Sequence, residues 1–66
     1  MLEKRSFTLS GHRTSVALEP EFWEVLGSAA QKEGLALSGL VTRIDAGRNE
    51  NQPLASALRV FALKAK

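Results

Sequence analysis

Apolar and polar residues alternate along the first third of the chain, on both sides of Gly11, and the alternation stops at Pro20. Between residues 13 and 18 the period is two, which is typical of a strand with one buried face. The expected inward-facing residues of this strand are Thr14, Val16 and Leu18. The pattern therefore predicts a half-buried strand that ends where a helix begins, because proline suits the first turn of a helix.

After the strand, apolar residues recur at helical spacing in three stretches. The expected helices cover residues 20–33, 38–46 and 53–66. Gly34 is the expected C-terminal cap of the first helix and Ser38 the N-cap of the second. A polar linker ending in Pro53 separates the second helix from the third. The chain is thus predicted to be a mostly helical α+β domain.

Apolar stripes are expected on the first and third helices, and the third helix carries more apolar surface than one stripe needs. The first helix is expected to bury Phe22, Val25, Leu26, Ala29 and Ala30, with Trp23 on the flank. Its aromatic residues are better explained as core than as a platform for stacking bases. The third helix has a stripe formed by Leu54, Ala57, Leu58, Phe61 and Ala65. Val60 and Leu63 fall outside that stripe, so a second subunit or another protein is expected to cover them.

The run before Gly11 leaves two arrangements open. Gly11 and His12 form a candidate two-residue type II′ loop, which pairs Phe7 with Val16. Such a hairpin occupies only one edge of the 13–18 strand, and the other edge remains a template for pairing. We expect the 13–18 strand to pair with its twin in a second chain. Residues 1–12 then form either an outer strand or a flexible arm.

Size and composition favour an oligomer. The chain has 66 residues, one histidine and no cysteine. A core of this size seldom supplies more than about 3–5 kcal/mol of stability without a disulfide, a metal or a partner. Disulfides are excluded, and one histidine is too few for a structural zinc site. We therefore expect a homodimer with no metal and no cofactor.

The formal net charge is only +2, but its distribution is uneven. Lysines and arginines occur in the strand region and at the C-terminal end, whereas glutamates gather between residues 19 and 33. This arrangement fits one cationic face better than general affinity for nucleic acid. No apolar run has the roughly 20 residues of a membrane span, and the first residues lead into no signal-peptide core. We expect a cytoplasmic protein.

The order of strand, helix, glycine and helix resembles the ribbon-helix-helix family of bacterial DNA-binding proteins. The stretch "TSVALEPEFWEVLGSAAQKEGLALSGLVTRI" carries the resemblance. The stretch "SGHRTSVALEPEFW" is similar to a subgroup of small family members with an added C-terminal segment. The resemblance implies a homodimer with an intermolecular antiparallel ribbon, a core domain over residues 13–47 and an extra helix over 53–66. Pro20 stands one residue later than is usual in the family.

In this family the ribbon enters the major groove of double-stranded DNA, and its outward side chains contact base edges. The implied base contacts here are Arg13, Ser15 and Ala17. An arginine fork can bond guanine O6 and N7 together, and serine bonds several bases. Ala17 departs from the family pattern, because a polar or basic residue is usual there. We therefore expect this strand to make few direct contacts with bases, and we expect DNA shape to contribute to recognition.

Phosphate contacts are implied at two further places. In the family, the start of the second helix holds a phosphate through its free backbone amides. The corresponding residues here are Ser38, Gly39 and Leu40. Lys4 and Arg5 form a candidate arm to the DNA backbone.

These observations give three functional hypotheses. The first is a bacterial DNA-binding protein that regulates transcription. The second is a protein-interaction or antitoxin-like module that keeps the dimer fold without reading DNA, with the C-terminal helix holding the partner. The third, an enzyme, ranks last because the chain offers no nucleophile–base pair and no phosphate loop. His12 is accordingly interpreted as a turn residue.

Overall fold

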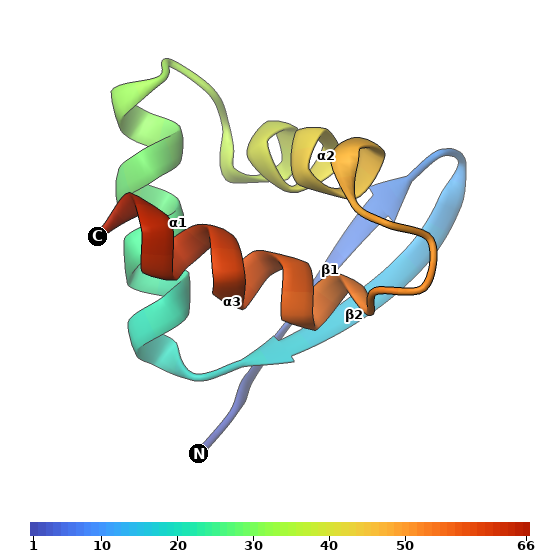
Figure 1. The fold of residues 1–66 in the computed structure, drawn as a ribbon, viewed down its shortest axis with the longest axis horizontal. Helices are drawn as coiled ribbons and strands as arrows, with labels where there is room; N and C mark the ends of the chain where they lie inside the picture. The colour runs from blue at the N-terminus through green and yellow to red at the C-terminus, as the bar shows by residue number, and fades with distance from the viewer.

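The computed structural model describes residues 1–66 and contains a two-stranded hairpin followed by three helices (Figure 1). The elements are β1 (Glu3–Leu9), β2 (His12–Leu18), α1 (Pro20–Lys32), α2 (Leu37–Gly47) and α3 (Leu54–Ala65). The predicted 13–18 strand and all three helices are confirmed, with each end within one residue of its expected position. Residues 3–9 form a strand that pairs with β2 in the same chain.

The hairpin turn differs from the prediction by one residue. Its two loop residues are Ser10 and Gly11, with φ angles of 53° and 80°. Two positive φ angles define a type I′ turn, whose twist matches that of the strands it joins. The type II′ loop at Gly11 and His12 was therefore wrong, and Phe7 pairs with Thr14 instead of Val16. Because each partner moves by two positions, every residue stays on its expected face.

α1 begins with Pro20 and ends in a Schellman motif around Gly34. Gly34 has a φ of 70°, and the N–H of Leu35 donates to the carbonyl of Ala30 at 2.9 Å. The N–H of Gly34 donates to the carbonyl of Gln31 at 3.1 Å. These two bonds satisfy carbonyls that the helix end would otherwise leave without partners. The predicted cap at Gly34 is confirmed, and it turns the chain toward α2.

The buried side of α1 is centred one residue away from the predicted stripe. Trp23, Leu26 and Ala30 are buried, whereas Phe22 and Val25 are only partly buried. Trp23 is 2% exposed and packs 5.8 Å from the ring of Phe7, measured between ring centres. The indole of Trp23 is buried because it packs against β1. The sequence pattern of the helix did not predict this, because it does not show which element lies beside the helix.

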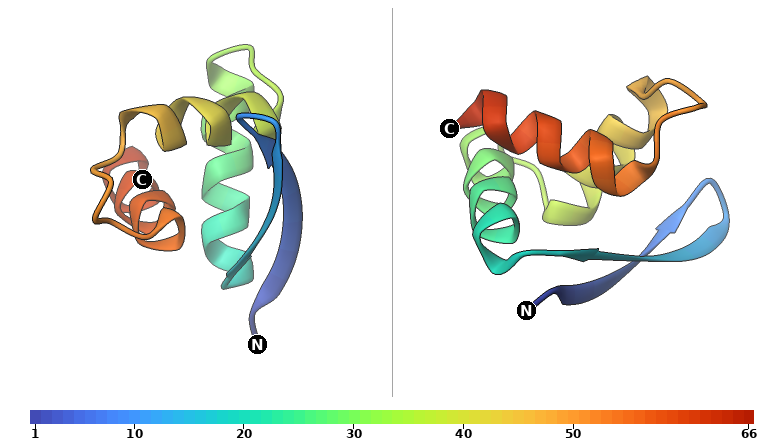
Figure 2. Two further views of the ribbon diagram at one scale, coloured as in Figure 1. Left: turned by 90° about the vertical axis from the view of Figure 1, so that its right-hand side faces the viewer. Right: turned by 60° about the horizontal axis from the view of Figure 1, so that its bottom comes forward.

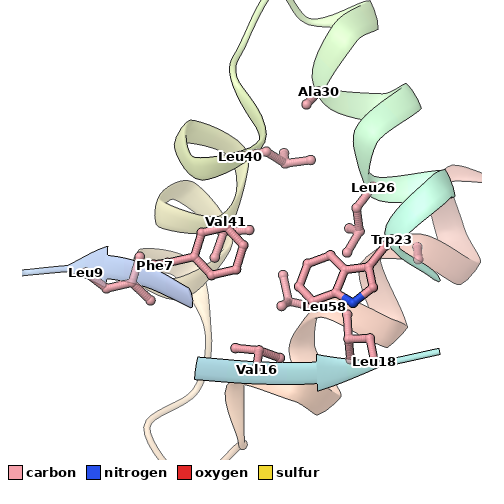
Figure 3. Close-up of a cluster of buried hydrophobic side chains, with 11 residues drawn as sticks. Phe7, Leu9, Val16, Leu18, Trp23, Leu26, Ala30, Leu40, Val41 and Leu58 are labelled. Atoms are coloured by element: carbon pink, nitrogen blue, oxygen red, sulfur yellow. The ribbon is translucent and has the colours of Figure 1, made fainter. Parts of the chain in front are cut away.

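One hydrophobic core joins all five elements (Figure 3). Its eleven members are Phe7, Leu9, Val16, Leu18, Trp23, Leu26, Ala30, Leu40, Val41, Leu58 and Ala62. In α3, Leu58 is fully buried, while Ala65 is exposed, contrary to the predicted stripe. Val60 and Leu63 are 40% and 63% exposed, as the spacing indicated. The C-terminal helix is therefore part of the core of its own chain.

The three helices all lie on one side of the hairpin, which is clearest in the left view of Figure 2. α3 packs against β2, and α2 packs against β1. The inner face of the hairpin thus closes the core, and its outer face is left without helical cover. None of the helices is long and apolar enough to cross a membrane.

Candidate nucleic-acid interface

The outer face of the β1–β2 hairpin, called the ribbon below, carries the residues assigned to base contact. Arg13 and Ser15 are exposed and Ala17 is partly buried. They alternate along β2 with Val16 and Leu18, which are buried against the helices. The pleat of the strand therefore brings all three predicted residues to the face that no helix covers (Figure 2).

β1 contributes a second polar row to the same face. The cross-strand pairs are Lys4 with Ala17, Ser6 with Ser15, and Thr8 with Arg13. The Oγ atoms of Ser6 and Ser15 lie 3.1 Å apart and share a hydrogen bond. Lys4 and Arg13 lie toward opposite ends of the ribbon and make no ion pair. The outer face thus presents two cations, three hydroxyls and no carboxylate.

The sequence predicted no contact for Ser6 or Thr8, because residues 1–12 could form either an arm or an outer strand. A signal was present in the alternation of Lys4, Ser6 and Thr8 with the apolar Phe7 and Leu9. Only the pairing of β1 with β2 places those two hydroxyls beside Arg13 and Ser15.

Arg5, predicted to contact phosphate together with Lys4, lies on the helix-facing side of the ribbon. Its guanidinium lies 2.6 Å from a carboxylate oxygen of Glu3 and 5.0 Å from the ring centre of Trp23. The indole N–H of Trp23 donates to the backbone carbonyl of Glu3 at 2.7 Å. The structure therefore separates Arg5 from Lys4, because neighbouring residues of a strand point to opposite faces.

The start of α2 differs in detail from the expected phosphate site. Ala36 is the N-cap residue and makes no side-chain cap, so the prediction of Ser38 as N-cap was wrong. The backbone amides of Ser38 and Gly39 lie in the first turn, where a helix offers no acceptor. The amide of Leu40, in contrast, donates to the carbonyl of Ala36 at 3.1 Å, and its side chain is fully buried. Two of the three predicted amides are thus free.

An ion pair holds α2 to the end of α1. The Arg43 guanidinium donates to a carboxylate oxygen of Glu33 at 2.6 Å. This hydrogen bond lowers the pKa of Glu33 and raises the pKa of Arg43. The charge of Arg43 is therefore engaged within the chain, unlike the charges of Lys4 and Arg13 on the ribbon.

The remaining candidate residues for base stacking or catalysis are Trp23, Phe22 and His12. Trp23 belongs to the core, and Phe22 packs against that core with the Arg59 guanidinium 5.8 Å from its ring centre. His12 is the exposed first residue of β2, directly after the turn. No group of three or more His, Cys, Asp or Glu side chains is placed to hold a metal ion.

A second feature of the surface is an apolar trough between α1 and α3. It has a volume of about 300 Å³, and its lining consists of four apolar residues and three charged ones: Phe22, Val25, Ala62, Leu63, Glu21, Glu24 and Lys66. Neither strand contributes to its lining. The molecule therefore offers two unlike surfaces, the polar ribbon face and the apolar α1–α3 trough.

Comparison with known families agrees with this architecture. A family model of the ribbon-helix-helix domain matches residues 2–65, so the chain belongs to the ribbon-helix-helix family. The domain is in general a DNA-binding or regulatory module, forms dimers and is typically non-enzymatic. No curated protein and no solved structure gives a significant match.

Proposed function

We propose that this chain is a bacterial transcriptional regulator that acts in the cytoplasm as a homodimer and places the outer face of its ribbon in the major groove of DNA. One observation carries the proposal: the outer face is polar, bears the cations Lys4 and Arg13 without any carboxylate, and has no helix over it. A two-stranded ribbon is one of the elements that the major groove admits.

Each proposed contact follows from side-chain chemistry. Arg13 bonds guanine through its two-pronged guanidinium, Ser15 bonds a base edge, and Ala17 packs against a thymine methyl. Lys4 and the free amides of Ser38 and Gly39 bind phosphates. Arg5 and Leu40 are left out of this set, because the first is held by Glu3 and the second donates its amide within the helix.

Dimerisation is proposed from the family and from the size of the core. Only twelve of the 66 residues are buried, and a chain this small gains stability from a partner. In an antiparallel pair, alternate residues of β2 direct their backbone N–H and C=O groups toward β1. With the register set by the type I′ turn, the N–H and C=O groups of Arg13, Ser15 and Ala17 point the other way, along the free edge of β2. That edge is where β2 is expected to meet its twin.

The test is fluorescence anisotropy of labelled random duplex DNA across a salt series. The wild-type protein is expected to bind with an affinity that falls steeply as salt rises. Arg13→Ala should weaken binding, and Arg13→Lys should keep the general affinity but lose any preference for guanine, because lysine lacks the fork. Lys64→Gln is the matched control, since it removes an exposed cation on α3. Absence of binding at low salt, or an equal loss in the Lys64→Gln control, would contradict the proposal.

A second variant tests the start of α2 separately. Ser38→Asp places a carboxylate among the free amides, where the helix dipole favours negative charge by about 0.3–1 kcal/mol. The same carboxylate should repel a phosphate. We therefore expect a more stable protein that binds DNA less tightly, measured by thermal melting and anisotropy. A variant that is more stable and binds DNA as well as wild type would remove this contact from the proposal.

The apolar trough favours a second candidate function, a protein-interaction or antitoxin-like module whose α3 holds a partner. Leu63 is the most exposed large apolar residue in the trough. Truncation before Pro53 is a poor test, because it removes the fully buried Leu58 from the core. Leu63→Glu is better: if this variant stays folded and binds DNA as before but loses a cellular phenotype, the α3 surface carries the function.

A further inference from the structure

The hairpin has two open edges, and each belongs to a different strand. The free edge of β2 is where β2 is expected to meet its twin. Pairing there builds a four-stranded sheet, because β1 already occupies the other edge of each β2. The β1 strands of the two protomers are then the outer strands of this sheet, one on each side of the central β2 pair.

The width of this sheet decides where β1 lies relative to DNA. Neighbouring strands lie about 4.8 Å apart, so the two outer strands of four lie roughly 14 Å apart. The major groove is about 12 Å wide, so it admits the central β2 pair but not the outer strands as well. Each β1 therefore lies over one of the two phosphate backbones that border the groove.

The outer face of β1 has side chains that suit phosphate. Lys4, Ser6 and Thr8 are exposed on this face, and they offer an ammonium group and two hydroxyls. Such groups are common donors to phosphate oxygens in protein–DNA complexes. The only carboxylate of β1, that of Glu3, lies on the helix-facing side, 2.6 Å from the Arg5 guanidinium. No negative charge on β1 therefore opposes a phosphate.

The outer edge of β1 adds backbone donors to the same row. In an antiparallel pair, alternate residues direct their backbone N–H and C=O groups toward the partner strand. With the register set by the type I′ turn, the N–H groups of Lys4, Ser6 and Thr8 point away from β2. No further strand pairs with this edge. The same three residues thus bring side-chain donors and backbone donors to the side of the sheet that meets the DNA backbone.

We propose that β1 is a phosphate-binding outer strand, in which Ser6 and Thr8 join Lys4 in holding the DNA backbone beside the groove that β2 and its twin enter. This inference rests on the proposed DNA-binding function and specifies it. The contact of β1 with the phosphates sets the depth at which Arg13 and Ser15 reach the bases. Because phosphate contacts carry no direct sequence information, β1 adds affinity and leaves the base preference to β2.

Removal of the two hydroxyls tests this role by anisotropy, on random duplex DNA and on a duplex selected by the wild-type protein. Thr8→Val and Ser6→Ala should each lose about 3- to 10-fold in affinity, as for one hydrogen bond. The loss should be the same on both duplexes, and repeated site selection should return the wild-type sequence preference. Thr14→Val is the matched control, because Thr14 lies on the inner face of the same hairpin and should keep wild-type affinity. Thermal melting confirms that each variant is folded.

An added cation tests the same row by a gain of binding. Ser6→Lys places one more positive charge on each β1, so a dimer should neutralise two further phosphates. The slope of log affinity against log salt should then become steeper by about 2. Ser28→Lys is the matched control, because it adds the same charge at an exposed serine of α1. An unchanged slope for Ser6→Lys, or an equal change in the control, would overturn the inference.

The outcomes separate this inference from the function on which it rests. If Arg13→Ala weakens binding while Thr8→Val and Ser6→Ala keep wild-type affinity, β1 does not hold phosphates. A changed base preference in either hydroxyl variant would mean that β1 contacts bases instead. In both cases the inference is wrong and the proposed function stands. If the wild-type protein shows no salt-dependent binding to DNA, both are wrong.

Discussion

The two faces of the ribbon are built from the same fourteen strand residues, yet they have opposite properties. The inner face holds the buried residues Phe7, Leu9, Val16 and Leu18. The outer face holds Lys4, Ser6, Thr8, Arg13, Ser15 and Ala17, and none of these is fully buried. Successive side chains of a strand point to opposite sides, so one alternating pattern both closes a core and presents a polar surface.

This difference assigns separate roles to neighbouring residues. A substitution on the inner face acts on the free energy of unfolding, because it changes packing among fully buried side chains. A substitution on the outer face leaves the packing of the core unchanged and alters only the polar surface of the ribbon. A register slip of one residue would exchange the two faces, and the core therefore holds the register firmly.

The largest expected effect is on the inner face. Leu18 is fully buried, and Leu18→Ala should reduce the free energy of unfolding by about 2–5 kcal/mol, which is enough to unfold much of a small domain. Ser15→Ala, on the outer face of the same strand, should change stability by less than about 0.5 kcal/mol. Urea denaturation followed by circular dichroism measures both. Equal losses from the two variants would mean that the outer face is also packed against something.

An intermediate effect is expected at the turn that holds the two faces in register. Gly11 has a φ of 80°, and an added Cβ would meet no atom within 4 Å. Gly11→Val should therefore cost about 1–2 kcal/mol through backbone conformation alone. Ser10→Asn should raise stability by a few tenths of a kcal/mol, because Asn-Gly is the preferred type I′ pair. Thermal melting of both variants checks the turn, and a neutral Gly11→Val would show that the hairpin is not closed there.

The smallest expected effect is the loss of stability at low pH. The pKa of Glu19 lies below its ordinary value of 4.5, because the carboxylate accepts hydrogen bonds from the backbone N–H of Glu19 and from the Arg59 guanidinium, 3.0 Å away. A hydrogen bond from Arg43 lowers the pKa of Glu33 in the same way. A lowered folded-state pKa contributes stability above pH 4.5 that is lost as the pH falls through the folded value. Because both carboxylates are solvent-exposed, the loss should be modest.

The acid experiment also distinguishes the two faces. No carboxylate lies on the outer face of the ribbon, so acidification should weaken the fold without changing the charges on that face. Urea denaturation at pH 7, 5, 4 and 3 measures the loss, and Arg59→Gln should lose less than wild type between pH 5 and pH 3. An Arg59→Gln variant with the same pH dependence as wild type would show that this ion pair contributes nothing.

Much of the fold was predictable because it depends on local patterns. Alternation placed Arg13, Ser15 and Ala17 on one face, and helical spacing with Pro20 and Gly34 placed the first helix. The turn was misplaced because Ser10 and Gly11, or Gly11 and His12, both satisfy local turn preferences. The choice between them depends on the full pairing of β1 with β2, which brings the carbonyl of Glu3 to the indole of Trp23.

The candidate site was less predictable than the fold. Arg5 and Lys4 are adjacent in sequence and alike in charge. Strand pairing and core packing, which the sequence does not show, place Arg5 over Trp23 and Lys4 on the outer face. Leu40 was expected to offer a free amide because the helix start was placed at Ser38. The helix in fact starts earlier, so that amide already has an acceptor.

Local chemistry in the chain was sufficient for the identity of β2 and of the three helices, for the two faces of β2 and for the resemblance to the ribbon-helix-helix family. Periodicity and capping residues act over a few positions, so they can be recognised without knowing the neighbours. Tertiary packing decided the pairing of β1 with β2, the full burial of Trp23, and the placement of Ser6 and Thr8 on the outer face of the ribbon. These depend on contacts between residues far apart in the chain, which no local pattern contains.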